Sequence, residues 1–286
     1  HHSAKLKLGE PNNTEGIIMK RLAITIGLPL LTAAIVGTTS VTMAGIKGSK
    51  HDLGSGGGAQ FTTSSTTEVC VFCHTPHGSN TGVTAPLWNK VSSTATYQRY
   101  SSLGTATLDG SEVAVGSVSL ACLSCHDGTQ AMDVVVNAPG SGLYNASGSA
   151  IDGGAFTMTG TPIPNLGTDL RNDHPISIQY AGGGCGSVTG DCTPSNGSDT
   201  NDPDFAIAQY QSLNGQNQWW VDESSGTADT REKTDMILYT RNFSGTEGPS
   251  VECASCHDPH EEASTPVSFL RVNNANSAVC LACHTK

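Results

Sequence analysis

The chain has 286 residues, and its 14 Lys and Arg against 25 Asp and Glu give a formal net charge of −11. Such an acidic chain is a poor nucleic-acid binder, so a nucleic-acid partner is not expected. Its 33 Gly stand against only 6 Phe, 6 Tyr and 3 Trp, which excludes a large conventional apolar core and, taken alone, favours loops.

The amino-terminal part of the chain is expected to be a targeting segment. Residues 1–18 look like an upstream segment that lies before the true start at Met19. In residues 19–44, Lys20 and Arg21 precede an apolar run, which is the pattern of a secretory signal peptide. We therefore predict that the protein is exported.

The predicted cleavage site follows the apolar run. Thr42 and Ala44 supply the two small residues that a signal peptidase requires before the bond it cleaves. The mature protein is then a single domain at residues 45–286. An uncleaved membrane anchor is the alternative, although the apolar run is short and is interrupted by Pro29.

A Cys-x-x-Cys-His run first occurs at Cys70, Cys73 and His74 and returns three times. The later copies are Cys122/Cys125/His126, Cys253/Cys256/His257 and Cys280/Cys283/His284. This run is the attachment signal for c-type haem: both thiols form thioethers, and the histidine becomes an axial iron ligand. Zinc or disulfides are alternatives, but a zinc centre does not require a histidine after every second cysteine.

Four covalent haems would change what the composition implies. Each haem is a large apolar plate tied to the chain, so four of them can replace the missing core and order a backbone with little regular structure. We therefore predict a multihaem cytochrome c fold, mostly irregular coil with a few short α-helices and minor β-structure, wrapped around a chain of four haems.

The long segment between the second and third motifs holds three candidate features. His174 precedes an alternating stretch, Ile176–Tyr180, which predicts a strand. Cys185 and Cys192 are the only cysteines outside the motifs, and in an exported protein they predict a disulfide, with a metal or reactive-thiol role as the alternative.

Two helices are predicted towards the carboxyl end. Asp202 is a candidate cap with Pro203 at the first helical position, and Asn276 or Ser277 would cap a short helix that carries the last motif. The Asp/Asn-rich tract at residues 198–204 lacks an EF-hand pattern and is interpreted as a solvated loop rather than a calcium site. No catalytic serine, phosphate loop or nucleotide-binding pattern stands out in the sequence.

The histidine inventory matches the number of haems. The chain has ten histidines; two, His1 and His2, lie in the upstream segment and four in the motifs. The remaining four are His51, His77, His174 and His260. Four irons need four sixth ligands, so we predict bis-histidine ligation at every iron. Sulfur ligation, which would raise the reduction potential, is the alternative, and its candidates are Met132, Met158 and Met236.

The spacing of His77 from His74 has a geometric consequence. Two ligands on opposite faces of one iron have Cα atoms on the order of 12 Å apart, whereas three residues of extended chain span at most about 10–11 Å. His77 must therefore bind a different iron from His74. The same holds for His257 and His260, so each of these segments would bring two haems close together.

The chain resembles the extracellular, filament-forming (nanowire) multihaem cytochromes of metal-reducing bacteria, especially tetrahaem members. The segments that carry the resemblance are "GIKGSKHDLG", "CVFCHTPHG", "CLSCHDGT", "NDHPISIQY", "CASCHDPHEE" and "CLACHTK". The resemblance implies subunits that stack head to tail into a homopolymer on the cell surface. It also implies upstream periplasmic or outer-membrane cytochromes and external electron acceptors as partners.

In that family a histidine after the first motif is lent to a haem of the adjacent subunit. The resemblance therefore implies that His77 crosses the interface, with His51 as the next candidate. Two other functions stay open: a monomeric periplasmic electron shuttle with the same ligation, and a multihaem reductase. A reductase needs an iron with an open coordination position, which the histidine count does not leave.

Overall fold

The computed structural model describes residues 45–140, 143–154, 156–160, 164–183, 202–223, 226–261 and 269–285. The chain divides into two units, His1–Val41 and Thr42–Lys286, and every described residue belongs to the second. The proposed upstream segment, the proposed signal peptide and both cysteines of the predicted disulfide, Cys185 and Cys192, lie outside the described residues. Among the described residues, no helix has the length and apolar character needed to cross a membrane.

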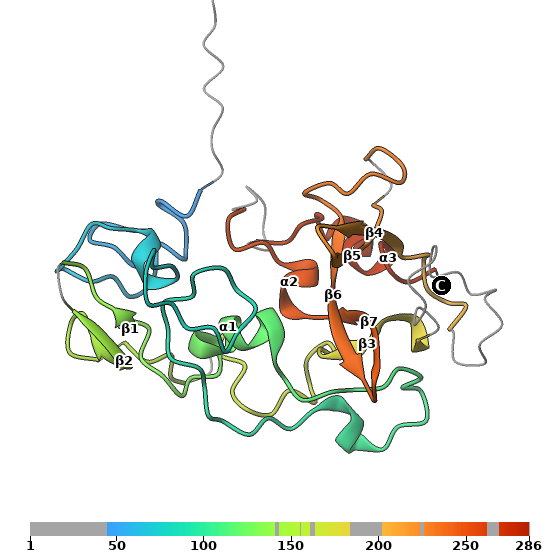
Figure 1. Cartoon of the computed structure of the whole chain (residues 1–286), viewed down its shortest axis with the longest axis horizontal. Helices are drawn as coiled ribbons and strands as arrows, with labels where there is room; N and C mark the ends of the chain where they lie inside the picture. Colours follow the sequence, from blue (N-terminus) through green and yellow to red (C-terminus); the bar gives the residue numbers. More distant parts are fainter. Residues whose placement is uncertain are drawn as a thin grey trace, which may run out of the picture. The chain divides into compact units, whose positions relative to one another are not determined.

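Most of the described backbone is coil (Figure 1), as the sequence predicts. The α-helices are short: α1 covers Ser117–His126, α2 covers Cys253–Cys256 and α3 covers Ala278–Leu281. Single 3-10 turns occur at Cys70–Phe72, Tyr100–Leu103, Tyr180–Gly182 and Ala275–Ser277. The expectation of a mostly irregular fold with a few short helices is confirmed.

The β-structure forms two antiparallel sheets. The smaller pairs β1 (Val134–Asn137) with β2 (Tyr144–Ala150). The larger has the order β3-β7-β6-β5-β4, and its strands are β3 (Ile178–Gln179), β4 (Gln209–Leu213), β5 (Gln216–Val221), β6 (Met236–Phe243) and β7 (Thr246–Val251). This five-stranded sheet is the main regular element of the fold.

Two tight turns explain why the larger sheet forms. Asn214 and Gly215 join β4 to β5, and Ser244 and Gly245 join β6 to β7; all four residues have positive φ. Positive φ at both central residues is what a type I′ hairpin turn requires, and Asn-Gly is its preferred sequence. These turns fix the strand register locally.

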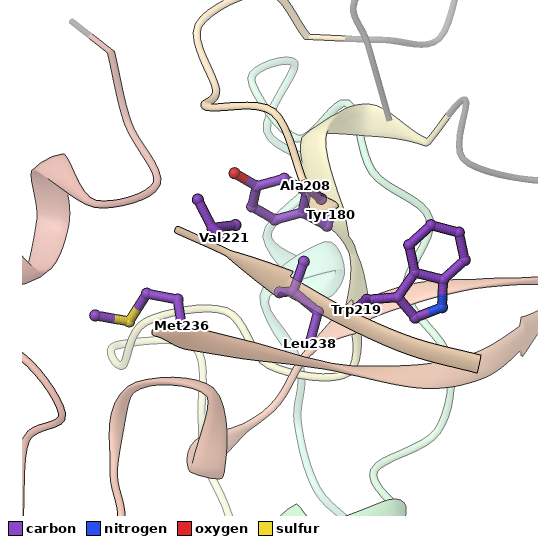
Figure 2. Close-up of a cluster of buried hydrophobic side chains, with 6 residues drawn as sticks. All are labelled: Tyr180, Ala208, Trp219, Val221, Met236 and Leu238. Carbon is purple, nitrogen blue, oxygen red and sulfur yellow. The ribbon is translucent and has the colours of Figure 1, made fainter. Parts of the chain in front are cut away.

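A small apolar core lies against the larger sheet. Figure 2 shows its buried side chains, which are Tyr180, Ala208, Trp219, Val221, Met236 and Leu238. Trp219 and Met236 are each 1% exposed. Burial of such side chains is the main stabilising term in folding, so this part of the chain has a core made of protein side chains alone.

The helix predicted after Asp202 is wrong. The carboxylate of Asp202 instead accepts a hydrogen bond from the amide of Asp204, at 2.9 Å, in an Asx turn. The next residues pair with the last motif, since Phe205 forms a β-bridge with His284. Strand β4 then pairs with β5, so tertiary pairing overrides the local helix signal.

The other two predicted elements are confirmed with changed details. The strand predicted at Ile176–Tyr180 is present but reduced to the two residues of β3. Helix α3 follows Ser277, as predicted, but Ser277 has φ of 62° and its side chain makes no capping hydrogen bond.

Candidate haem-binding site

Each of the four motifs forms a single helical turn. The histidine amide donates to the carbonyl of the first cysteine in three of them, at 2.8 Å for His74, 3.2 Å for His257 and 2.9 Å for His284. The second motif forms the last turn of α1. Residues three and four apart lie on the same face of such a turn. Both thiols and the imidazole of each motif can therefore reach one ligand, as haem attachment requires.

The first and last motifs are held by chain segments that the sequence did not indicate. Trp88 pairs with His74 in a β-bridge, and the amide of Asn89 donates to the carbonyl of Cys73 at 2.9 Å. The ring of Phe205 lies 4.4 Å from that of His284. These contacts hold both motifs in place, although neither motif is part of a long helix or strand.

Six of the eight candidate iron ligands form three close pairs of rings. The ring centroids are 6.1 Å apart for His51 and His126, 6.0 Å for His74 and His260, and 6.5 Å for His174 and His284. Two imidazoles on opposite sides of one metal, each with a metal–nitrogen bond of about 2 Å, have centroids about 6 Å apart. The residues present therefore fit bis-histidine ligation.

Backbone carbonyls orient several of these rings. The Nδ1 atom of His74 lies 2.7 Å from the carbonyl oxygen of Pro86, and Nδ1 of His126 lies 2.7 Å from that of Pro164. The Nδ1 atom of His174 lies 3.0 Å from the carbonyl of Pro175. When Nδ1 donates its proton to a carbonyl, Nε2 keeps its lone pair for a metal. Nothing in the motif spacing indicates these partners.

The charges of several candidate ligands follow from their surroundings. Burial, assisted by the neighbouring His126, lowers the pKa of His51 to about 4. Desolvation by neighbouring side chains also lowers the pKa of His174 and of His257. A hydrogen bond with Asp258 raises the pKa of His260. At neutral pH the three lowered groups are neutral imidazoles, which is the form that binds metals.

The motif thiols lie beside one another in chain order. Cys73 of the first motif neighbours Cys125 of the second, and this contact together with burial raises the pKa of Cys73 to about 12, with burial as the larger cause. Cys122 of the second motif shares a hydrogen bond with Cys253 of the third. The third motif in turn neighbours the fourth through Cys256. Haems attached to the four motifs would therefore lie next to one another in the order of the motifs along the chain.

His77 and His257 differ from the other six candidate ligands. Within the described residues, neither ring lies in such a pair with another imidazole. His77 is exposed, whereas His257 has an exposed residue surface but a ring that neighbouring side chains partly desolvate. The carbonyl of His77 accepts hydrogen bonds from Thr75 Oγ1, at 3.0 Å, and Asn137 Nδ2, at 3.3 Å. The backbone therefore holds His77 in place while its ring faces solvent.

Two of the methionines that are alternative iron ligands have buried side chains. Met236 is part of the apolar core, and Met132 is 7% exposed. Among the described residues, no group of three or more His, Cys, Asp or Glu side chains is arranged to hold a metal ion by itself, so the zinc alternative has no site of that kind there.

A family model described as a doubled CXXCH motif matches residues 247–286, which contain the third and fourth motifs. No curated protein matches the chain. The doubled motif and the helical turns that present it indicate covalently bound c-type haem. They indicate a multihaem c-type cytochrome, and hence an electron-transfer protein.

Proposed function

We propose that the chain carries four haem c groups, each between two histidines, and polymerises head to tail into an extracellular filament that conducts electrons to external acceptors. The proposal is supported by the three ring pairs, which leave His77 and His257 without a partner imidazole among the described residues of their own chain. One haem per motif would supply a one-electron iron couple at each of four neighbouring positions.

The pairing supports a ligand set within one chain. His126, His74 and His284 would be the motif ligands of three irons, and a second imidazole lies close to each of them. The fourth iron would be held by His257 and needs a distal ligand from elsewhere. His77, the remaining histidine, is exposed and can serve the His257 iron of another copy of the chain.

The surface around His77 supports contact between copies. Three large apolar side chains near it are exposed, namely Leu87 at 52%, Leu143 at 48% and Tyr144 at 57%. They are local to His77: the Thr75 amide donates to the carbonyl of Leu87, and Asn137 is paired with Tyr144. We call Leu87, Leu143 and Tyr144 the His77 collar. Exposed apolar clusters of this kind mark interaction sites.

The backbone of the collar is strained. Leu87 has φ of 54°, a conformation that is a genuine outlier for a bulky residue. Gly78, directly after His77, has φ of +65°, which glycine adopts without strain, and a Cβ there would lie 2.8 Å from the Tyr144 ring, so the loop packs closely on the collar. Strain of this kind persists where the surrounding structure demands it and is concentrated at functional sites. It supports a docking role for the collar.

The substitution His77→Ala tests the proposal, with Ser79→Ala as the matched control in the same loop. We expect secreted His77→Ala protein to keep four covalent haems by intact mass, to form no filaments by negative-stain imaging, and to show one high-spin haem. The control should form filaments with low-spin haems only. Filaments that persist in His77→Ala would refute the shared ligand. Wild-type protein that sediments as a monomer would instead support the periplasmic shuttle.

A further inference from the structure

A buried ion pair lies between the second and third haem motifs. Glu252 directly precedes Cys253 and is 1% exposed. Its Oε1 atom accepts a hydrogen bond from Nη1 of Arg241 at 2.6 Å, and the Glu252 side chain has no exposed surface. A buried carboxylate is costly unless it is paired and hydrogen-bonded, so this arrangement is specific to its site.

Both oxygen atoms of the Glu252 carboxylate accept hydrogen bonds from two side chains each. Oε1 also accepts from Ser250 Oγ at 3.0 Å, while Oε2 accepts from Ser119 Oγ at 2.5 Å and from Ser177 Oγ at 3.2 Å. These partners come from β7, from α1 and from the residue before β3. The carboxylate is therefore the point where three separate segments meet.

Ser119 links the pair to both attachment helices. It lies on α1, three residues before Cys122, and is fully buried. Its Oγ donates to Glu252 and accepts from the amide of Cys253 at 2.9 Å. The sulfur atoms of Cys122 and Cys253 are neighbours, since as free thiols they share a hydrogen bond. Ser119 thus ties the helix of one motif to the first cysteine of the next.

Arg241 fixes the network to the sheet. It lies on β6, and its Nη2 atom donates to the carbonyl of Ala114, just before α1, at 2.7 Å. A guanidinium offers donors in a rigid fork, so a single side chain can bind the carboxylate and the carbonyl together. Arg241 therefore holds the start of α1 and the cap of α2 in one geometry.

We infer that the Arg241–Glu252 pair is a positioning device for the haems of the second and third motifs, and that its two opposite charges balance the reduction potentials of those haems. The inference rests on the part of the proposed function that attaches a haem to each of these motifs, and it is independent of the filament. Glu252 directly precedes Cys253 and is hydrogen-bonded through Ser119 to the helix that carries Cys122, so removing one charge should change the field on irons held at these two motifs.

The two charges predict shifts of opposite sign. Glu252→Gln leaves the positive Arg241, which favours the reduced iron, so the midpoint potential of the affected haems should rise. Arg241→Met leaves the negative Glu252, so the midpoint should fall. Each change is expected to be roughly tenfold in the reduction equilibrium constant, or about 59 mV for a one-electron couple. The double variant should return close to the wild-type values.

Matched controls remove the same charges at exposed positions. Glu247→Gln on β7 and Arg231→Met both replace exposed residues, where solvent screens the charge, so each should change the constant less than about twofold. Spectroelectrochemical titration of the intact chain gives the midpoints, and intact mass gives the haem number. Fewer than four haems on the wild-type chain would refute the proposed function. Full haem content with single-variant shifts of the same sign, or with no shift, would refute the charge balance.

Ser119→Ala tests positioning separately from charge. It removes the hydrogen bonds of Ser119 Oγ with Glu252 and with the Cys253 amide without altering net charge, so the reduction equilibrium constants should stay within about twofold of wild type. Circular dichroism in the Soret band reports the spacing and angle of neighbouring haems, and its exciton signal should change. An unchanged signal in Ser119→Ala would overturn the positioning role.

Discussion

The imidazole rings of His74 and His260 lie 6.0 Å apart with their planes 15° from parallel, although the two residues come from the first motif and from just beyond the third. The pairs His51/His126 and His174/His284 have similar separations but planes at 76° and 63°. Parallel and perpendicular imidazole planes on ferric haem give distinct EPR signals: rhombic for parallel planes and strongly anisotropic for perpendicular planes. Haems held between these pairs, as proposed, are therefore expected to give different spectroscopic signatures.

Replacing His260 by Ala should remove one rhombic low-spin signal. The iron held by His74 loses its distal ligand and becomes high-spin, while the strongly anisotropic signals of the other two pairs remain. EPR of the oxidised protein, with intact mass to confirm an unchanged haem number, measures this. His51→Ala is the matched comparison, because it should remove a strongly anisotropic signal instead. Loss of the same signal in both variants would contradict the pairing.

Replacing Tyr144 by Ser should weaken filament assembly. Tyr144 is the most exposed member of the His77 collar, and truncating an aromatic anchor at an interface commonly costs about 2 kcal/mol. The concentration needed for assembly should rise roughly thirtyfold, as measured by sedimentation over a dilution series. Leu213→Ser is the control, since Leu213 is similarly exposed but lies at the β4–β5 hairpin. Equal effects of the two substitutions would argue against the collar.

Replacing Lys90 by Met should destabilise the region of the first motif. Lys90 is 3% exposed, and its Nζ atom donates to the carbonyls of Met132 and Val134, at 2.8 Å each. Methionine keeps the length of the side chain but leaves one buried and one partly buried carbonyl without their donor, at a cost of about 2–4 kcal/mol. Denaturant unfolding followed by tryptophan fluorescence measures the loss.

Lys50 provides the comparison for Lys90. It is an exposed lysine, and Lys50→Met removes the same charge without leaving a buried carbonyl unpaired. The free energy of unfolding should therefore change by less than about 0.5 kcal/mol. Identical stabilities for Lys90→Met and Lys50→Met would show that the buried hydrogen bonds of Lys90 contribute nothing.

Replacing Gly57 by Ala should displace His51. A Cβ at Gly57 would lie 2.1 Å from the carbonyl oxygen of Asp52, so the backbone next to His51 has to move. The iron held by His126 should then lose its distal ligand and become high-spin. Resonance Raman spectroscopy detects the change in spin state. Ser55→Ala, in the same loop and exposed, should leave a fully low-spin spectrum; a low-spin Gly57→Ala protein would refute the constraint.

Some features of this protein can be predicted from the sequence alone, and others cannot. The four motifs are predictable because covalent attachment demands particular residue types at short, fixed spacings. The mostly irregular backbone is predictable because the chain is rich in Gly and poor in aromatic residues. The eight candidate iron ligands stay a prediction, and the four distal ones come from the histidine count. Asn214 and Gly215 also carry a local hairpin signal, since Asn-Gly is the preferred sequence of a type I′ turn. The prediction of a helix after Asp202 is wrong because its cap signal is local, whereas the pairing of Phe205 with His284 is not.

The order of residues along the chain establishes the chemistry: which side chains can attach haem and how many imidazoles are available to its iron. Folding in three dimensions establishes which distant histidines meet, which proline carbonyls orient them, and that Glu252 and Arg241 join two motifs. The physical reason is that attachment depends on residues three and four apart, whereas ring pairing and burial depend on contacts between segments far apart in the chain, which short-range patterns do not encode.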